Sequence, residues 1–343
     1  MDLRGTTREV VDALEQWLGR DDDEPLVVET SGSTGRPKRV VLPRAAVRAS
    51  GRATAARLGG EGAWLLALPA AYVAGAQVVC RSLAAGHAPT LVEEHDSLAA
   101  AVAAMPAVDR YVSLVPTQLR RALEDPDSLG ALRDVRAVLL GGGPVDADLR
   151  ERAAAAGVRT VATYGSAETA GGCVYDGVPL DGVGLALAAD GRIRLAGPTL
   201  FERYDGDPAL TAEVLVDGWF HTADAGRLDE DGRLQVLGRV DDVVVTGGVN
   251  VPAPAVAARL RAHPELADAE VVGVPDAEWG HRLVALVVGA RVPSLEVLRD
   301  WVGEVHPRTW APREVLVLDA VPQLGNGKPD RQALRRLAGA GGA

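Results

Sequence analysis

The sequence predicts an α/β protein. We expect a large N-terminal domain with parallel-rich layered sheets and a β-rich subdomain, and a small, mobile α+β lid domain at the C-terminus. Up to about residue 170, short apolar runs alternate with segments of helical periodicity, as in parallel α/β sheets. From about residue 182, strand-like runs separated by Asp-Gly turns follow. Beyond a charged segment at residues 238–242 a second, shorter alternation begins, so we expect domains at residues 1–238 and 239–343.

The first domain is expected to be organised around a parallel sheet. Short apolar runs that end near turn-forming residues predict strands at residues 63–68, 89–92, 109–115, 135–140 and 158–163. Helical spacing predicts helices at residues 8–18, 45–58, 76–85, 117–123 and 148–156. Such sheets bind ligands at the carboxyl ends of their strands. The glycine-bearing loops after Leu140 and Thr163 follow successive strands, so we expect them to lie side by side.

Shorter elements are expected in the C-terminal half. The β-rich subdomain is predicted to contain strands at residues 193–196, 219–222, 226–228 and 234–237. The lid domain is predicted to contain helices at residues 254–262 and 294–305 and strands at residues 270–274, 283–288 and 314–318. It ends in a loop, residues 324–331, with the sequence LGNGKPDR.

Composition argues against several classes of function. The net charge of −11 disfavours non-specific binding to nucleic acid and docking on anionic membranes. The two cysteines, Cys80 and Cys173, give no disulfide framework, and no apolar run approaches the ~20 residues that a membrane span needs. The N-terminus lacks the apolar core of a signal peptide. We therefore expect a cytoplasmic protein with small-molecule partners, and leave open whether it forms a homodimer.

The segment TSGSTGRPKRV, residues 30–40, is the first candidate for a binding loop. Its glycines permit tight turns, its hydroxyls and N–H groups can donate to phosphate oxygens, and its basic residues add positive charge. The spacing differs from that of a Walker loop. Composition alone does not decide between a phosphate cradle and a flexible surface loop. The residues that would form the cradle are Thr30, Ser31, Gly32, Ser33, Thr34, Gly35 and Lys38.

Five segments of the chain, this loop among them, match the motifs of a known family in the same order. The chain resembles the adenylate-forming acyl- and aryl-CoA synthetase superfamily in the segments TSGSTGRPKRV, YGSAET, FHTADAG, GRVDD and GNGKPDR. The resemblance covers nearly the whole chain. The stretch GGCVYDGVPLDGVG, residues 171–184, and the short segment upstream of the first motif are similar to the short actinobacterial o-succinylbenzoate–CoA ligases of the menaquinone pathway.

The resemblance implies a reaction in two halves. A carboxylic acid attacks the α-phosphorus of ATP and releases pyrophosphate, and the thiol of coenzyme A then attacks the acyl-adenylate and releases AMP. The first half brings an anion to a polyanion, so Mg²⁺ and cationic side chains must screen the charge. Glu168 would ligate Mg²⁺, Lys328 would bridge the substrate carboxylate and the α-phosphate, and Asp241 and Asp242 would form the hinge of the lid.

The remaining site residues are also implied by the resemblance. Asp224 would accept from the ribose hydroxyls, with Arg239 as its partner at the hinge. Adenine would stack on Tyr164, next to Gly165 and opposite the loop Gly141, Gly142, Gly143 and Pro144. The pocket for the acid would be formed by Tyr72, Ser113, Gly171, Gly172 and Val174. Cys173 is expected to be a small packed residue, because the reaction needs no enzyme thiol.

Two departures from the family pattern keep other functions open. Ala167 replaces the usual hydroxyl residue before Glu168, and Tyr72 stands where the family has a histidine. One alternative is an enzyme that adenylates another aryl or acyl acid and loads it onto coenzyme A or a carrier protein. The other is a nucleotide-binding relative with weak catalysis, which Glu168 and Lys328 argue against because a pure binder would not need both.

Overall fold

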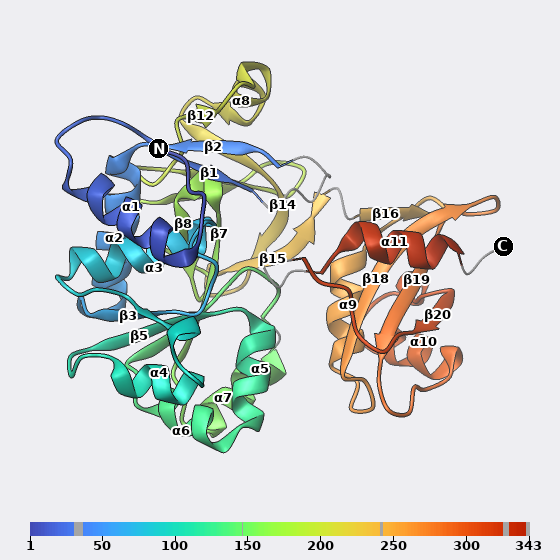
Figure 1. The fold of residues 1–343 in the computed structure, drawn as a ribbon. Coiled ribbons are helices and arrows are strands. Elements are labelled where there is room, and N and C mark those ends of the chain that lie inside the picture. The colour runs from blue at the N-terminus through green and yellow to red at the C-terminus, as the bar shows by residue number, and fades with distance from the viewer. Residues whose placement is uncertain (31–36, 146, 241–242, 325–328, 341–343) are drawn as a thin grey trace. The chain divides into compact units, whose positions relative to one another are not determined.

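The computed structural model describes residues 1–30, 37–145, 147–240, 243–324 and 329–340 (Figure 1). The chain forms two compact units. Unit 1 comprises Met1–Ala186, Arg194–His221 and Leu228–Leu234, and unit 2 comprises Leu187–Ile193, Thr222–Arg227 and Gln235–Ala343. The predicted division at residues 238 and 239 stays a prediction. Within the described ranges, no helix has the length and apolar character needed to cross a membrane.

Unit 1 contains a seven-stranded sheet with the strand order β4-β3-β5-β6-β7-β8-β9. The strands are β3 (Ala63–Leu66), β4 (Thr90–Leu91), β5 (Arg110–Leu114), β6 (Ala137–Leu140), β7 (Thr160–Ser166), β8 (Gly171–Tyr175) and β9 (Val178–Pro179). Neighbours from β4 to β7 are parallel, and β8 and β9 continue the sheet antiparallel. The predicted parallel sheet is therefore confirmed. Both of its edge strands are only two residues long.

Helices cover both faces of this sheet (Figure 1). They are α1 (Thr7–Gly19), α2 (Arg44–Leu58), α3 (Val73–Ala84), α4 (Leu98–Ala104), α5 (Pro116–Glu124), α6 (Pro126–Arg133) and α7 (Ala147–Ala155). Strand β3 is buried on both faces: Trp64 and Leu66 belong to the core under α1 to α3, whereas Ala63 and Leu65 belong to the core under α4 to α7. This burial explains why the strand is a continuous apolar run rather than an alternating one.

The phosphate-loop candidate lies outside this parallel sheet. It joins β1 (Leu26–Glu29) to β2 (Arg39–Leu42), which pair antiparallel, and β12 (Arg203–Tyr204) adds to β2 from far along the chain. The loop therefore belongs to a hairpin in a separate three-stranded sheet. The short helix α8 (Pro208–Val214) follows β12.

The β-rich part contains a five-stranded sheet in which β10, β11, β14 and β13 are neighbours and β15 pairs with β14. Its strands are β10 (Gly184–Leu187), β11 (Arg192–Ala196), β13 (Leu215–Val216), β14 (Trp219–Leu228) and β15 (Leu234–Arg239). The prediction of two strands at residues 219–222 and 226–228 is wrong, because β14 runs unbroken through both. The intervening Ala223, Asp224 and Ala225 include no glycine or proline that would interrupt a strand.

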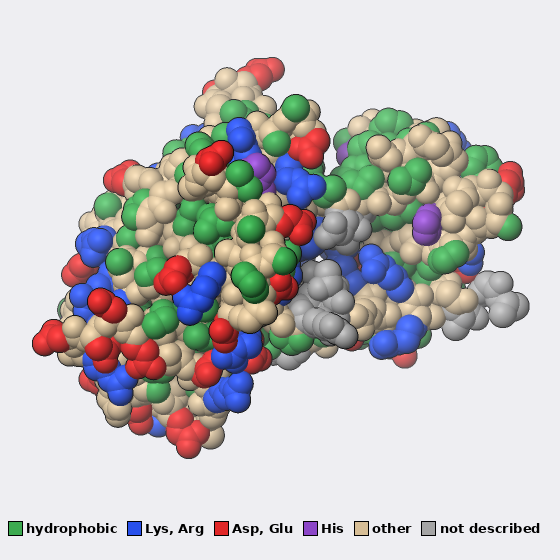
Figure 2. All heavy atoms as spheres, turned by 90° about the horizontal axis from the view of Figure 1, so that it is seen from above, with side chains coloured by type: hydrophobic (Ala, Val, Ile, Leu, Met, Phe, Trp, Pro, Cys, Tyr) green, Lys and Arg blue, Asp and Glu red, His purple; other side chains and the backbone are tan. Residues whose placement is uncertain are grey.

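Unit 2 has an α+β core, as predicted for the lid. Its central strands are β18 (Asp268–Asp276), β19 (Gly280–Val288) and β20 (Glu314–Val317), preceded by the hairpin β16 (Val243–Thr246) and β17 (Val249–Pro252). The helices α9 (Ala253–Arg261) and α10 (Leu295–Gly303) pack with one face of this sheet. The helix α11 (Arg331–Ala340) packs with the other face through Leu334 and Ala338. Acidic and basic side chains are interspersed over the surface drawn in Figure 2.

Candidate functional site

The chain directly after β6 lies beside β7, at Thr163, after which the sequence predicts the second loop to begin. Strand β6 pairs in parallel with β7. A Cβ added at Gly141 would lie 2.5 Å from Oγ1 of Thr163, so the backbone after β6 approaches β7 more closely than any side chain would allow. The amide of Gly141 also donates to the carbonyl of Leu114 at the end of β5 (3.3 Å). Gly141 thus lies between the carboxyl end of β5 and the middle of β7.

Strand β7 extends further than predicted, and this extension assembles part of the candidate site. Its last three residues pair antiparallel with β8, which brings Tyr164 opposite Val174, Gly165 opposite Gly172, and Ser166 opposite Gly171. The sequence predicted that the strand ends at Thr163. That boundary is wrong, because the pairing partner comes from the following chain reversal rather than from local periodicity.

Glycine is required on both sides of this pairing. A Cβ at Gly165 would lie 2.1 Å from the carbonyl oxygen of Gly171, and Gly171 itself has φ +95°. The preceding Ala170 also adopts a left-handed conformation, with φ +49°. The buried side-chain amide of Gln77, on α3, donates to the carbonyl of Ala170 (2.8 Å). The candidate acid-pocket residues therefore belong to a tightly packed turn that α3 holds from behind.

Glu168 lies in the short 3₁₀ helix Ala167–Thr169 that makes this reversal. Its side chain is 8% exposed, and its Oε1 accepts a hydrogen bond of 2.7 Å from the hydroxyl of Tyr204. Among the described residues, no Lys, Arg or His lies within ion-pair distance of this carboxylate. A buried carboxylate without a cationic partner suits Mg²⁺, which proteins commonly bind through one or two carboxylates together with substrate phosphates.

Tyr204 connects Glu168 to the base of the phosphate-loop candidate. The ammonium of Lys38 lies 5.2 Å from the centroid of the Tyr204 ring, a cation–π distance. Strand β12 carries Tyr204 next to Val40 of β2. Sequence reasoning missed Tyr204, because nothing in its local sequence, RYDGD, distinguishes it from a core aromatic residue. Only the pairing of β12 with β2, across more than 160 residues, reveals its place.

The two ends of the phosphate-loop candidate are fixed to one another. The amide of Thr30 donates to the carbonyl of Lys38 (2.8 Å), and the amide of Lys38 donates to Oγ1 of Thr30 (3.0 Å). The predicted residues between them, Ser31, Gly32, Ser33, Thr34 and Gly35, lie outside the described residues, as do the predicted Lys328, Asp241 and Asp242.

Tyr72 comes after β3, and Ser113 lies near the carboxyl end of β5. Tyr72 is half-buried in the connection between β3 and α3, directly before the helix. Ser113 is buried near the end of β5, opposite Leu139 of β6. Their predicted contacts with the acid stay predictions.

Asp224 and Arg239 belong to unit 2. The amide of Asp224 donates to Oγ1 of Thr222 (3.1 Å), and that hydroxyl donates to the carbonyl of Ile193 (2.9 Å). The backbone of Asp224 is thus held by the neighbouring strand β11. Arg239 is the last residue of β15. Their roles at the ribose stay predictions.

Cys173 is fully buried in β8, and burial raises the pKa of its thiol to about 12. The thiol is therefore protonated at neutral pH, where it cannot act as a nucleophile. This environment confirms that Cys173 is a packed residue.

Two family models and several individual proteins match this chain. The family model described as AMP-binding enzyme matches residues 17–208, and the model of the AMP-binding enzyme C-terminal domain matches residues 255–328. A probable 2-succinylbenzoate–CoA ligase from Mycobacterium tuberculosis is 46% identical over 330 residues, which are 93% of this chain and 86% of that protein. The 2-succinylbenzoate–CoA ligase of Bacillus cereus is 30% identical, covering 91% of this chain and 69% of that protein.

Solved structures show the same similarity. The o-succinylbenzoate–CoA synthetase of Bacillus subtilis, in complex with its acyl-adenylate intermediate, superposes with a TM-score of 0.79 at 28% identity, covering 90% of this chain and 68% of that chain. A structure of the same synthetase with ATP and a magnesium ion gives a TM-score of 0.78 at 28% identity, covering 90% and 69%. An amide bond synthetase from Marinactinospora thermotolerans gives 0.81 at 28% identity, covering 92% and 69%.

Proposed function

The chain belongs to the AMP-binding enzyme family, and from this premise we propose that it is an AMP-forming ligase that joins 2-succinylbenzoate to coenzyme A. The observation that carries the proposal is the 46% identity to the mycobacterial ligase over 93% of the chain. In the first half-reaction the carboxylate oxygen bonds to the α-phosphorus of ATP, and pyrophosphate leaves. In the second, the sulfur of coenzyme A bonds to the acyl carbon, and AMP leaves.

Several described residues support the proposed first half-reaction. Glu168 supplies a buried carboxylate for Mg²⁺, and Lys38 supplies positive charge at the base of the phosphate loop. Mg²⁺, when bound with ATP, would neutralise charge on the phosphates as pyrophosphate departs. We assign the binding of adenine to Tyr164 and to the loop that begins at Gly141, which follows β6 at the carboxyl edge of the sheet. We assign Lys328 to the reacting carboxylate, and coenzyme A to the second half-reaction.

The acid is proposed to bind where β7 and β8 reverse. In this reversal Gly165 pairs with Gly172, and Gly171 pairs with Ser166. Glycine permits the close approach of the two strands, which fixes the backbone that would border the acid. Tyr72, from the connection after β3, and Ser113, from β5, would complete the pocket for the acid.

ATP–pyrophosphate exchange across a panel of acids tests the proposal. We expect exchange with 2-succinylbenzoate to exceed exchange with benzoate and with medium-chain fatty acids, and we expect thioester to form when coenzyme A is added. Exchange that is greater with a different acid would show that this other acid is the substrate. Adenylation without transfer to coenzyme A would favour the loading of a carrier protein, and no exchange with any acid would favour a nucleotide-binding relative.

A further inference from the structure

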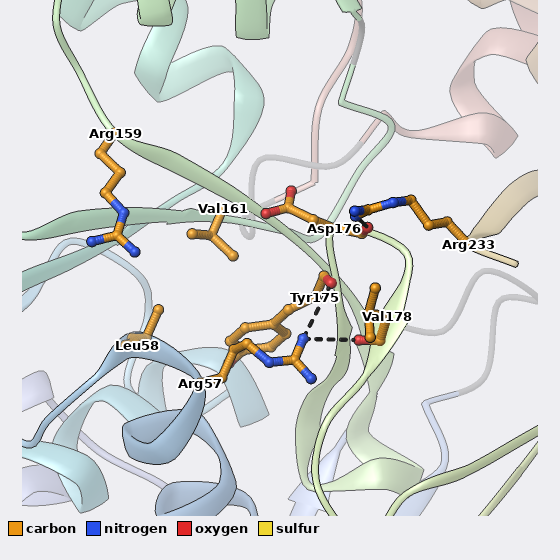
Figure 3. A pocket seen from close by; sticks show the side chains of 8 residues that line it. All are labelled: Arg57, Leu58, Arg159, Val161, Tyr175, Asp176, Val178 and Arg233. Atoms are coloured by element: carbon orange, nitrogen blue, oxygen red, sulfur yellow. Dashed lines mark hydrogen bonds between the residues drawn. The ribbon is translucent and has the colours of Figure 1, made fainter. Parts of the chain in front are cut away.

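A pocket lies at the amino end of β7, whereas the candidate site lies at the carboxyl end of this strand. Its volume is about 380 Å³, within the range of small-molecule sites. The lining residues are Arg57, Leu58, Arg159, Val161, Tyr175, Asp176, Val178 and Arg233 (Figure 3). Arg159 directly precedes β7, whereas Glu168 follows its other end. The length of β7, seven residues, separates the two places by about 20 Å.

Three guanidinium groups surround this pocket, and none has a carboxylate partner among the residues that the structure describes. Arg57 donates to the carbonyl of Val178 (3.2 Å), and Arg233 donates to the carbonyl of Asp176 (3.0 Å). Carbonyl groups hold these side chains in place but do not neutralise their charge. In the described part of the chain, neither they nor Arg159 has a carboxylate oxygen within 4 Å.

The one carboxylate in the lining is already engaged. Oδ1 of Asp176 accepts from the guanidinium of Arg150 (2.8 Å) and from the amide of Ala162 (3.0 Å). The residue sits in the turn between β8 and β9 with φ +48°, which these hydrogen bonds help to hold. The negative charge of Asp176 is therefore paired with Arg150, and the three lining arginines leave the pocket with an excess of positive charge. Such a concentration is notable in a chain of net charge −11, which would otherwise repel anions.

The rest of the lining is apolar. Leu58, Val161 and Val178 contribute aliphatic side chains, and Figure 3 shows Val161 and Leu58 between Arg159 and Arg57. An inorganic anion would leave these surfaces in water. An anion with an apolar body would bury them, while its charged end accepts from the fork of a guanidinium.

We propose that this pocket binds a small organic anion of the aromatic carboxylate class, with Arg159 as the main donor. Arg159 is exposed, and no intramolecular hydrogen bond of its side chain is found in the described residues. All five of its N–H donors remain available to a ligand. The proposal concerns a site separate from adenylation, and it does not rest on the proposed ligase activity.

Calorimetric titration with benzoate, and separately with inorganic phosphate, tests the proposal on four proteins. These are the wild type, Arg159→Ala, Arg159→Lys and the control Arg152→Ala. Arg152 is an exposed residue of α7 whose guanidinium lies 3.9 Å from Asp148, so its removal changes the net charge equally but away from the pocket. We expect Arg159→Ala to weaken benzoate binding about tenfold, as the loss of a charge-assisted hydrogen bond does. Arg159→Lys should give an intermediate loss, and Arg152→Ala none.

The outcomes separate this site from the active site. Equal benzoate affinity in Arg159→Ala and Arg152→Ala would overturn the proposal, as would the absence of any benzoate binding to the wild type. Tighter binding of phosphate than of benzoate would overturn the aromatic class. ATP–pyrophosphate exchange should be unchanged in Arg159→Ala whichever acid the enzyme uses. If the alanine variant fails to fold, Arg159→Gln repeats the comparison with a long polar side chain in place.

Discussion

The hydroxyl of Tyr204 donates to Oε1 of Glu168 over 2.7 Å, and both side chains are buried. A carboxylate held from one side can present its other oxygen in a fixed direction. Because Tyr204 also lies under the ammonium of Lys38, one side chain connects the proposed metal ligand with the base of the phosphate loop. The orientation of Glu168 therefore depends on a strand far away in the sequence.

Tyr204→Phe removes this hydrogen bond and keeps the ring. We expect the Mg²⁺ concentration that half-saturates ATP–pyrophosphate exchange to rise several-fold, because Glu168 loses its fixed orientation. We also expect the free energy of unfolding to fall by about 1–3 kcal/mol, since the hydrogen bond to a charged group is lost. Calorimetric titration with ATP, with and without Mg²⁺, gives a second readout that does not depend on turnover.

The matched control is Tyr111→Phe. The hydroxyl of Tyr111 donates to the carbonyl of Gly60 (3.0 Å), so this variant also loses a hydrogen bond from a buried tyrosine. It should lose stability without a change in Mg²⁺ dependence. If both variants shift the Mg²⁺ dependence equally, Tyr204 has no specific positioning role.

Glu168→Gln keeps the shape of the side chain and removes its charge. We expect pyrophosphate exchange to fall at least about a hundredfold, which is typical when one electrostatic contact in a transition state is lost. Binding of ATP without Mg²⁺ should be unaffected or tighter, because a negative charge near the phosphates is gone. Glu202→Gln, at an exposed residue nearby in the same unit, is the control. Full exchange activity in Glu168→Gln would exclude Glu168 as the metal ligand.

Lys328→Ala should separate the two half-reactions. Formation of the acyl-adenylate should be abolished, because the bridging ammonium is needed as charge shifts toward pyrophosphate. Thioester formation from preformed acyl-adenylate and coenzyme A should be largely retained. Single-turnover assays of each half-reaction make the comparison, and an equal loss in both would contradict the assigned role.

Gly165→Ala tests the close approach of β7 and β8. The new Cβ would lie 2.1 Å from the carbonyl oxygen of Gly171, so the strands must separate. We expect a loss of about 1–3 kcal/mol in the free energy of unfolding, as in other overpacked sites, and weaker binding of the acid. Gly303→Ala, where no heavy atom lies within 4 Å of the added Cβ, is the control in denaturant unfolding. Equal stability of the two variants would show that the strands adjust without cost.

The buried thiols predict a pH dependence of stability. Burial raises the pKa of Cys80 and of Cys173 to about 12. In the unfolded chain a thiol ionises near its ordinary pKa of about 8.5, so the folded state binds more protons at alkaline pH. Stability should therefore fall as the pH rises from about 9 toward 12. Urea midpoints of the wild type and of a Cys80→Ala, Cys173→Ala double variant measure this effect: the difference between the two proteins should be constant below pH 8 and should change only above it.

Local sequence was sufficient for the parallel sheet but not for the site. Apolar runs such as that of β6 are buried on both faces, so their position follows from composition alone. The pairing of Gly165 with Gly172 and the contact of Tyr204 with Glu168 depend on strands that come together only in the folded chain. The sequence did not predict an unbroken β14, because a polar residue such as Asp224 is more typical of a turn than of a strand interior. Resemblance to a family located Glu168, but only the fold showed what holds it.

The two-residue strands β4 and β9 limit how this sheet can grow. Each offers few free main-chain groups at its edge, and Pro179 in β9 has no N–H to donate. Another polypeptide strand would therefore find little template for adding to either side, which protects the sheet against fibril-like stacking during folding. If two copies of the chain associate, we do not expect the seven-stranded sheet to continue from one copy into the other.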